Sequence, residues 1–147
     1  MADLKITVEF DTEKIKSELE TAAARALEIV GGKAETYAKL LCPVDTGALR
    51  DSIRHSVNEG TVSVGAGESY APYVELGTGK YFVMPPAWVE FHAKRGRGLP
   101  KWVYRDRDGN FRTGYPQPPK PFIRPSLENH ADEYKTVFES ELKKGSL

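Results

Sequence analysis

Apolar and polar residues follow two different periods in the first third of the chain. Residues 4–10 carry an apolar side chain at every second position, which is the period of a half-buried strand. From Thr12 to Leu41 the apolar positions recur three or four residues apart, which predicts one long amphipathic helix. We expect Asp11 or Thr12 to cap its start. Pro43 ends it, because the residue before a proline is kept out of the helical conformation.

Two adjacent glycines, Gly31 and Gly32, fall inside this predicted helix. Each glycine weakens a helix by about 1 kcal/mol relative to alanine. We therefore expect a kink at this point, or two helices in sequence. The apolar stripe of the helix runs along Ile15, Leu19, Ala22, Ala26, Ile29, Tyr37 and Leu40.

Two pairs of short runs, each separated by turn residues, predict β-hairpins. In the first pair, residues 52–57 and 61–64 flank the turn Asn-Glu-Gly. In the second pair, residues 102–105 and 110–113 carry aromatic side chains and flank an Asp-Gly turn. The chain therefore contains an antiparallel β component that is local in sequence.

Three further helical segments are expected. Asp45 and Thr46 are cap-type residues before a short turn of helix, and residues 70–77 predict a short helix that ends at Gly77. The last helix opens at Pro125 or Ser126 and runs to about Lys144, with apolar positions three or four residues apart. Lysines in its last turn suit the negative end of the helix dipole.

These elements predict the fold class α+β. A long N-terminal helix and a C-terminal helix are packed on a small antiparallel β-sheet, with an extended basic insertion that carries a hairpin. Helices and strands do not alternate as they would in a parallel βαβ fold. The chain has 147 residues, the usual size of one domain, so we expect a single domain over residues 1–147 with the insertion at about 80–120.

Charge is separated along the chain although the net charge is zero, from 21 basic and 21 acidic residues. Residues 91–124 hold nine Lys or Arg and two Asp, a balance of +7, so the remainder carries −7. Eight of the ten prolines lie in residues 85–125, and aromatic residues are interleaved with the basic ones. Such a segment could follow a nucleic-acid backbone and stack on bases, or dock on an acidic protein surface. A solvated loop is the third interpretation.

The chain offers no recognisable catalytic motif. His55, His92 and His130 stand far apart without zinc-ligand spacing, and Cys42 is the only cysteine. Phosphate-loop and nucleophile-elbow motifs are missing, as are an apolar run of membrane-spanning length and a signal-peptide pattern. We therefore expect no cofactor, no metal and no membrane, and folding in a reducing cytoplasm. A site built from carboxylates such as Asp45, Asp51 and Glu75 stays open at this point.

Three strings occur in a specific order: CPVDTGALRDSI at residues 42–53, YAPYVELGTG at 70–79 and KPFIRPSL at 120–127. Together with the Trp-Val-Tyr run and the Gln-Pro-Pro-Lys-Pro run of the insertion, they resemble the neck or tail-completion proteins of long-tailed bacteriophages. The resemblance covers about residues 10–144. Ser126 stands where many relatives carry alanine, an acceptable exchange at a helix start.

The resemblance implies a non-enzymatic virion protein of the head–tail connector, assembled in the host cytoplasm. Such proteins form a homo-oligomeric ring, six-fold in the favoured case and twelve-fold in the alternative, that continues the DNA channel without sequence-specific DNA binding. Their partners are head-side connector or stopper proteins and a tail terminator or tail tube protein. The alternative function is that of a nucleic-acid-binding or nuclease-like accessory protein that uses the basic aromatic insertion.

The candidate interface residues lie mostly in the insertion, which we expect to dock on a neighbouring subunit or ring. Outside the insertion, we hypothesise that Glu75 pairs with Arg50 or Arg124. The full set is Arg50, Glu75, Arg95, Arg97, Lys101, Trp102, Tyr104, Arg105, Arg107, Phe111, Arg112 and Arg124.

Overall fold

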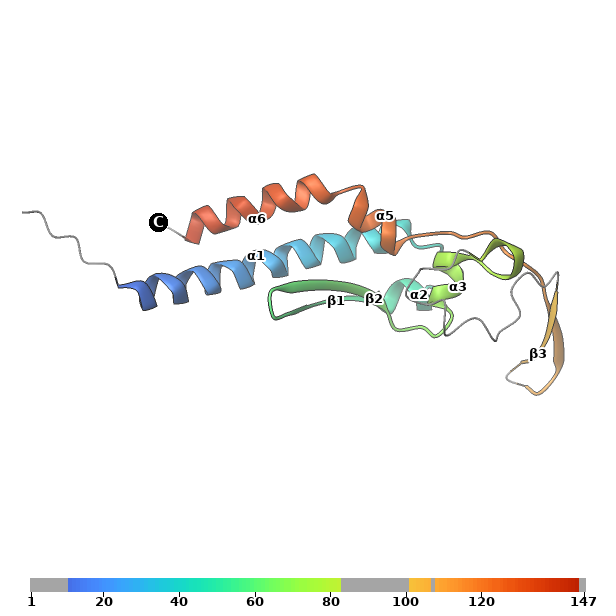
Figure 1. Cartoon of the computed structure of the whole chain (residues 1–147). Helices are drawn as coiled ribbons and strands as arrows, with labels where there is room; N and C mark the ends of the chain where they lie inside the picture. The colour runs from blue at the N-terminus through green and yellow to red at the C-terminus, as the bar shows by residue number, and fades with distance from the viewer. Residues whose placement is uncertain (1–10, 83–100, 107, 146–147) are drawn as a thin grey trace, which may run out of the picture.

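A long helix, α1 (Thr12–Leu41), forms the axis of the molecule, and other elements pack on two of its sides (Figure 1). The structure, a computed structural model, describes residues 11–82, 101–106 and 108–145. The C-terminal helix α6 (Ala131–Gly145) lies along one side of α1, and the hairpin of β1 (Ile53–Asn58) and β2 (Thr61–Ala66) lies along the other. The predicted class α+β is confirmed. The strand expected at residues 4–10 lies outside the described residues.

Both predicted ends of α1 are confirmed. The Asp11 side chain caps the helix by accepting a hydrogen bond from the Lys14 backbone N–H at 3.0 Å. At the other end, Cys42 has an extended conformation, φ −64° and ψ 127°, before Pro43. Cys42 is buried in the core, as a small apolar residue would be, and burial raises the pKa of its thiol.

The helix runs without interruption through Gly31 and Gly32, so the expected division at these glycines is wrong. Gly31 is buried where the hairpin crosses α1, and a Cβ atom placed on it would lie 2.4 Å from Cδ2 of His55. The glycine permits a close approach between helix and strand. The packing of the strand against the helix offsets the unfavourable helix propensity.

Small side chains form the buried stripe of α1: Ala22, Ala26, Gly31, Ala34 and Ala38. Because these residues are small, α6 and the hairpin can both come close to the helix axis. Of the predicted apolar stripe, Ile15, Leu19 and Leu40 are instead exposed, at 52%, 51% and 75%.

The first hairpin pairs β1 with β2 in an antiparallel register that runs from Ile53↔Ala66 to Asn58↔Thr61. Its two-residue turn, Glu59-Gly60, has φ of 47° and 77°, and left-handed conformations at both positions match the twist of the strands. One face, with Ile53, His55 and Val57 on β1, is directed toward α1. The hairpin prediction is confirmed.

Two short helices, α2 (Ala48–Asp51) and α3 (Ala71–Leu76), flank this hairpin in sequence, and a 3₁₀ turn, η1 (Gly79–Tyr81), follows α3. The prediction of a helix ending at Gly77 is confirmed. The N-cap of the earlier helix is Gly47 at φ 90°, so capping by Asp45 is wrong; of the two expected cap-type residues, Thr46 accepts the Ala48 backbone N–H through Oγ1 at 3.4 Å.

The second hairpin, β3 (Trp102–Arg105) with β4 (Phe111–Gly114), is also confirmed. Its loop is held by Asp106, whose Oδ1 accepts the backbone N–H groups of Asp108 and Asn110 at 3.0 and 2.8 Å. This hairpin lies at the opposite end of the molecule from the first turn of α1 (Figure 1).

The C-terminal helix begins earlier than predicted and is divided in two. Helix α5 (Ile123–Glu128) is separated from α6 by a break at residues 129–130. The break reorients the chain so that α6 follows α1. His130 in the break stacks on Tyr37 of α1 at 3.6 Å between ring centroids, and Tyr134 donates a hydrogen bond back to the Ser126 carbonyl.

The hydrophobic core lies at the C-terminal end of α1, where Phe122 and Ile53 are completely buried. The cluster around them consists of Ala38, Cys42, Leu49, Ile53, Ala71 and Phe122. Because the core draws on α1, α2, β1, α3 and the segment before α5, it fixes these short elements relative to one another.

Candidate functional site

The three sequence motifs meet at this core. Leu49 comes from the first motif, Ala71 from the second and Phe122 from the third, and all three belong to one buried cluster. The three motifs therefore form a single packed unit. The segments around it form the end of the molecule at which the hairpin of β3 and β4 lies (Figure 1).

Glu75 joins the second motif to the third through the backbone. Its Oε2 accepts the N–H groups of Phe122 and Ile123 at 2.7 and 3.0 Å, and its Oε1 accepts that of Arg124 at 2.9 Å. These are N–H groups at the start of α5, which have no partner inside the helix, and a carboxylate also suits the positive end of the helix dipole.

The hypothesis that Glu75 pairs with the side chain of Arg50 or Arg124 is wrong. Its carboxylate is occupied by the backbone of α5, and it reaches Arg124 only through the main-chain N–H. The Arg50 guanidinium instead lies 3.6 Å from Asp51, and the Arg124 side chain is exposed.

A clamp closes the base of the insertion. The Thr78 backbone N–H donates to the Gln117 carbonyl at 2.9 Å, and the Gln117 N–H donates to Thr78 Oγ1 at 2.8 Å, although these residues are 39 positions apart. Gly77, at φ 79°, permits this approach, because a Cβ atom there would lie 2.9 Å from the Pro119 nitrogen. The Lys120 N–H adds a bond to the Val74 carbonyl at 2.8 Å.

The same three motifs line an open cleft of about 370 Å³. Val44, Tyr70 and Tyr73 in its wall are 56%, 41% and 43% exposed, and Asp45 and Lys120 add one charge of each sign. A partly apolar surface with exposed tyrosines is typical of protein–protein contact. Sequence reasoning did not find this cleft, because its walls come from segments that meet only in the fold.

The hairpin of β3 and β4, which we call the arm, lies within the insertion. Arg105 lies over the Phe111 ring, 5.0 Å from its centroid, and Phe111 itself is 73% exposed. Arg112 donates from Nε to Asp106 Oδ2 at 2.9 Å. This bond is the main cause of the lowered pKa of the Asp106 carboxyl. Lys101 is exposed at the start of the arm.

Five other insertion residues belong to the predicted interface, two of them on β3 and three outside the described residues. In the register of the arm, Trp102 pairs with Gly114 and Tyr104 with Arg112. Arg95, Arg97 and Arg107 lie outside the described residues. The structure thus brings six of the predicted interface residues onto one hairpin: Lys101, Trp102, Tyr104, Arg105, Phe111 and Arg112.

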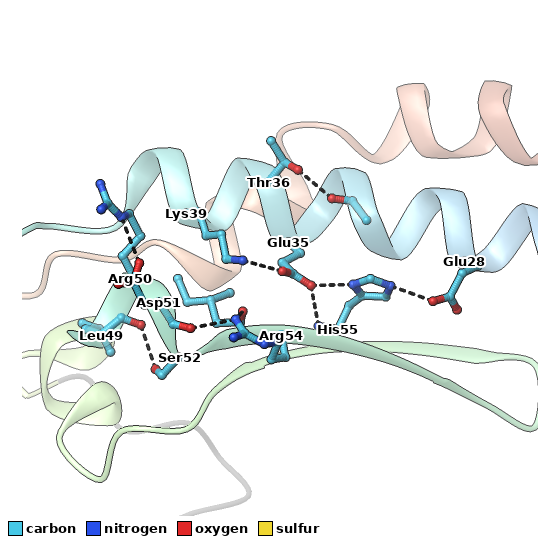
Figure 2. Close-up of polar contacts among 12 residues, drawn as sticks. Glu28, Glu35, Thr36, Lys39, Leu49, Arg50, Asp51, Ser52, Arg54 and His55 are labelled. Carbon is cyan, nitrogen blue, oxygen red and sulfur yellow. Dashed lines mark hydrogen bonds and ion pairs between the residues drawn. The ribbon is translucent and has the colours of Figure 1, made fainter. Parts of the chain in front are cut away.

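A polar network fixes the first hairpin on α1 (Figure 2). Glu35 Oε2 lies 2.6 Å from His55 Nδ1 and accepts the His55 backbone N–H at 3.0 Å, while Glu35 Oε1 accepts from Lys39 Nζ at 2.5 Å. Glu28 lies 3.1 Å from the other ring nitrogen. The hydrogen bond from Lys39, then that from His55, lowers the pKa of Glu35 to about 2. The hydrogen bond to Glu35 raises the pKa of His55.

A second network fixes α6 on α1. Glu133 accepts from Lys33 Nζ at 2.7 Å and from the Tyr37 hydroxyl at 2.8 Å. The bond from Lys33, then that from Tyr37, lowers the pKa of Glu133. Burial raises the pKa of Tyr134 to about 12. Both networks hold elements of one chain together, so we assign them a role in the stability of the fold.

The described part of the chain holds no group of three or more His, Cys, Asp or Glu residues placed to bind a metal ion. Within the same residues, no helix is long and apolar enough to cross a membrane. The main features at this end of the molecule are the clamped base of the arm and, beside it, the cleft with exposed tyrosines. Fold and site together define a small α+β protein whose arm and cleft expose apolar and aromatic side chains, as protein–protein contact surfaces do.

The family comparison agrees with this class. Residues 7–77 match the model of the HK97-gp10-like family, described as "Bacteriophage HK97-gp10, putative tail-component". The match bears out the resemblance to phage neck and tail-completion proteins over residues 7–77, and it supports a structural component of a phage tail. Comparisons with curated proteins and with solved structures gave no match.

Proposed function

We propose that the protein is a non-enzymatic ring subunit of the head–tail connector. The ring joins the head-side connector to the tail terminator or tail tube and continues the DNA channel, with six-fold symmetry favoured over twelve-fold. The observation that carries this proposal is that the tail-component family match and the three tail-completion motifs share one packed unit.

The clamped arm supports the proposal because a ring subunit needs a projecting element that reaches its neighbour. Thr78 and Gln117 fix both ends of the insertion to the core unit, so the arm extends from a rigid base. Exposed apolar and basic side chains on the arm suit an acidic protein surface. The separation of charge between insertion and body makes such contacts sensitive to salt.

Electron microscopy and light scattering of the purified chain test this function. The expected result is closed rings, or a chain that is monomeric alone and completes tails when added to them. A chain that stays monomeric at high concentration and also fails to complete tails would contradict the proposal. High salt should weaken assembly more than it weakens the fold.

The second candidate function is nucleic-acid binding, which rests on the basic and aromatic composition of the insertion. A DNA-binding protein would lose affinity steeply with salt, in proportion to the number of phosphates contacted. We expect the isolated ring subunit to show little salt-sensitive affinity for duplex or single-stranded DNA. A steep negative slope of log affinity against log salt would favour the second function.

A further inference from the structure

The first turns of α1 form a surface that no other described element covers, and we call it the helix tip (residues 12–21). Every residue of the helix tip is exposed. Helix α6 ends at Gly145, where a Cβ atom would lie 2.5 Å from Cβ of Ala22, so the cover that α6 provides stops at Ala22. The apolar stripe continues past this point: Ile15 and Leu19 are 52% and 51% exposed.

The helix tip and its cap are acidic. Residues 11–20 hold four carboxylates (Asp11, Glu13, Glu18, Glu20) against two lysines (Lys14, Lys16). Glu18 follows Ile15 by three positions and precedes Leu19, so the helical period places it at the border of the apolar stripe. Within the described residues its ion-pair partner is Lys14, 3.9 Å away in a long contact between two exposed side chains, which an arginine from another copy can replace. A partner for this surface should therefore present apolar side chains next to a basic one.

The arm presents such a surface. The antiparallel register places Val103, Arg105 and Phe111 on one face of the hairpin, with Arg105 opposite Phe111, and we call this set the arm face. Val103 and Phe111 are 66% and 73% exposed, and Arg105 lies over the Phe111 ring. Asp106, which follows Arg105 in the chain, is engaged by its own loop and by Arg112, so it does not neutralise the arm face.

The two surfaces cannot meet within one chain. The arm lies at one end of the molecule and the helix tip at the other (Figure 1), and the 30 residues of α1 span about 45 Å. A contact between unlike surfaces on two copies is heterologous, and repetition of such a contact generates a closed ring when the rotation closes.

We propose that the arm face of one copy docks on the helix tip of the next copy. Phe111 and Val103 cover Ile15 and Leu19, and Arg105 pairs with Glu18. This inference rests on the proposed ring function and names the contact that builds the ring. Two apolar residues on each side and one exposed ion pair between them make a small contact, so assembly depends on the neighbouring rings for stability.

Cysteine cross-linking in completed particles tests the contact. Variants carry Cys42→Ala, and then Leu19→Cys, Val103→Cys or both, and each is added to tails that lack the protein. After oxidation, particles completed with a mixture of the two single variants should yield a covalent dimer on a non-reducing gel. The double variant should yield a ladder that ends at the ring number. Ser17→Cys, which faces away from the apolar stripe, is the matched control and should not cross-link to Val103→Cys.

Completed particles without the Leu19–Val103 link, or with equal linking from Ser17→Cys, would overturn the contact and leave the ring function intact. Failure of the unmodified chain to complete particles would instead contradict the ring function. As a second measurement, Glu18→Arg and Arg105→Glu should each raise the protein concentration needed for half-completion by about fivefold, and the double exchange should restore it. No recovery in the double exchange would exclude this ion pair.

Discussion

Two adjacent glycines in α1 allow the packing of the hairpin to be tested with one substitution at two positions. A Cβ atom at Gly32 meets nothing within 4 Å, whereas a Cβ atom at Gly31 lies 2.4 Å from Cδ2 of His55. Both positions lie inside the same uninterrupted helix. Gly32→Ala should therefore stabilise the protein by about 0.8–1 kcal/mol, the difference in helix propensity.

Gly31→Ala gains the same helix propensity and loses more through steric overlap. The His55 ring cannot move freely, because Glu35 binds both its Nδ1 and its backbone N–H and Glu28 binds the other ring nitrogen. Overpacking costs about 1–3 kcal/mol, and loss of one hydrogen bond to a charged group costs about 1.5–3 kcal/mol. After the propensity gain is subtracted from the sum of these two costs, we expect net destabilisation of about 1.5–5 kcal/mol.

Urea unfolding followed by circular dichroism measures both variants, with the slope of the transition as a check on two-state behaviour. Gly32→Ala should raise the free energy of unfolding and Gly31→Ala should lower it, so that the two variants differ by about 2.5–6 kcal/mol. In a His55→Ala background the overlap is removed, so Gly31→Ala should become stabilising by about 1 kcal/mol. Equal stabilisation by Gly31→Ala and Gly32→Ala in the unmodified chain would refute the close-approach explanation.

Three further predictions concern the contacts that position the site. Glu75→Ala should destabilise the chain by about 2–4 kcal/mol in urea unfolding, because three N–H groups at the start of α5 lose their acceptor. Glu75→Gln keeps one acceptor oxygen and should destabilise the chain by about 1–2 kcal/mol. Equal stability of both variants and the wild type would contradict the capping role. Thr78→Val removes the hydroxyl that accepts the Gln117 N–H, so it should speed proteolysis within the insertion several-fold while lowering global stability by about 1 kcal/mol. Thr78→Ser keeps the hydroxyl and should behave like wild type. Unchanged cleavage in the valine variant would argue against the clamp. Stability should fall on acidification from about pH 4.5 toward 2, because the pKa of Glu35 is lowered to about 2 in the folded chain. Stability should also fall as the pH rises above about 6.5, because the folded chain raises the pKa of His55. Thermal midpoints measured across pH should lose this second decline in His55→Gln, and its persistence there would count against the His55–Glu35 pair.

Elements with local signals could be predicted from the sequence. Asp11 and Pro43 mark the ends of α1, and Glu59-Gly60 and the Asp-Gly loop mark the two hairpins. Their periods and turn residues act between near neighbours in the chain. The fold class followed from these elements and their order.

Features that depend on tertiary contact could not be predicted. Glu75 binds backbone groups 47 to 49 positions away, and no sequence pattern distinguishes such an acceptor from a partner of arginine. Gly31 looked like a helix breaker because the His55 ring that requires it comes from a strand. The break between α5 and α6 is stabilised by the stacking of His130 on Tyr37, which is likewise distant in sequence.

Complementation of unfinished particles tests the central claim most directly. In a lysate of the phage that encodes this chain, with the gene inactivated, electron microscopy should show filled heads and separate tails. Addition of the purified protein should then join them and restore infectivity. Joined, infectious particles in the absence of the protein would contradict its assignment to the head–tail connector.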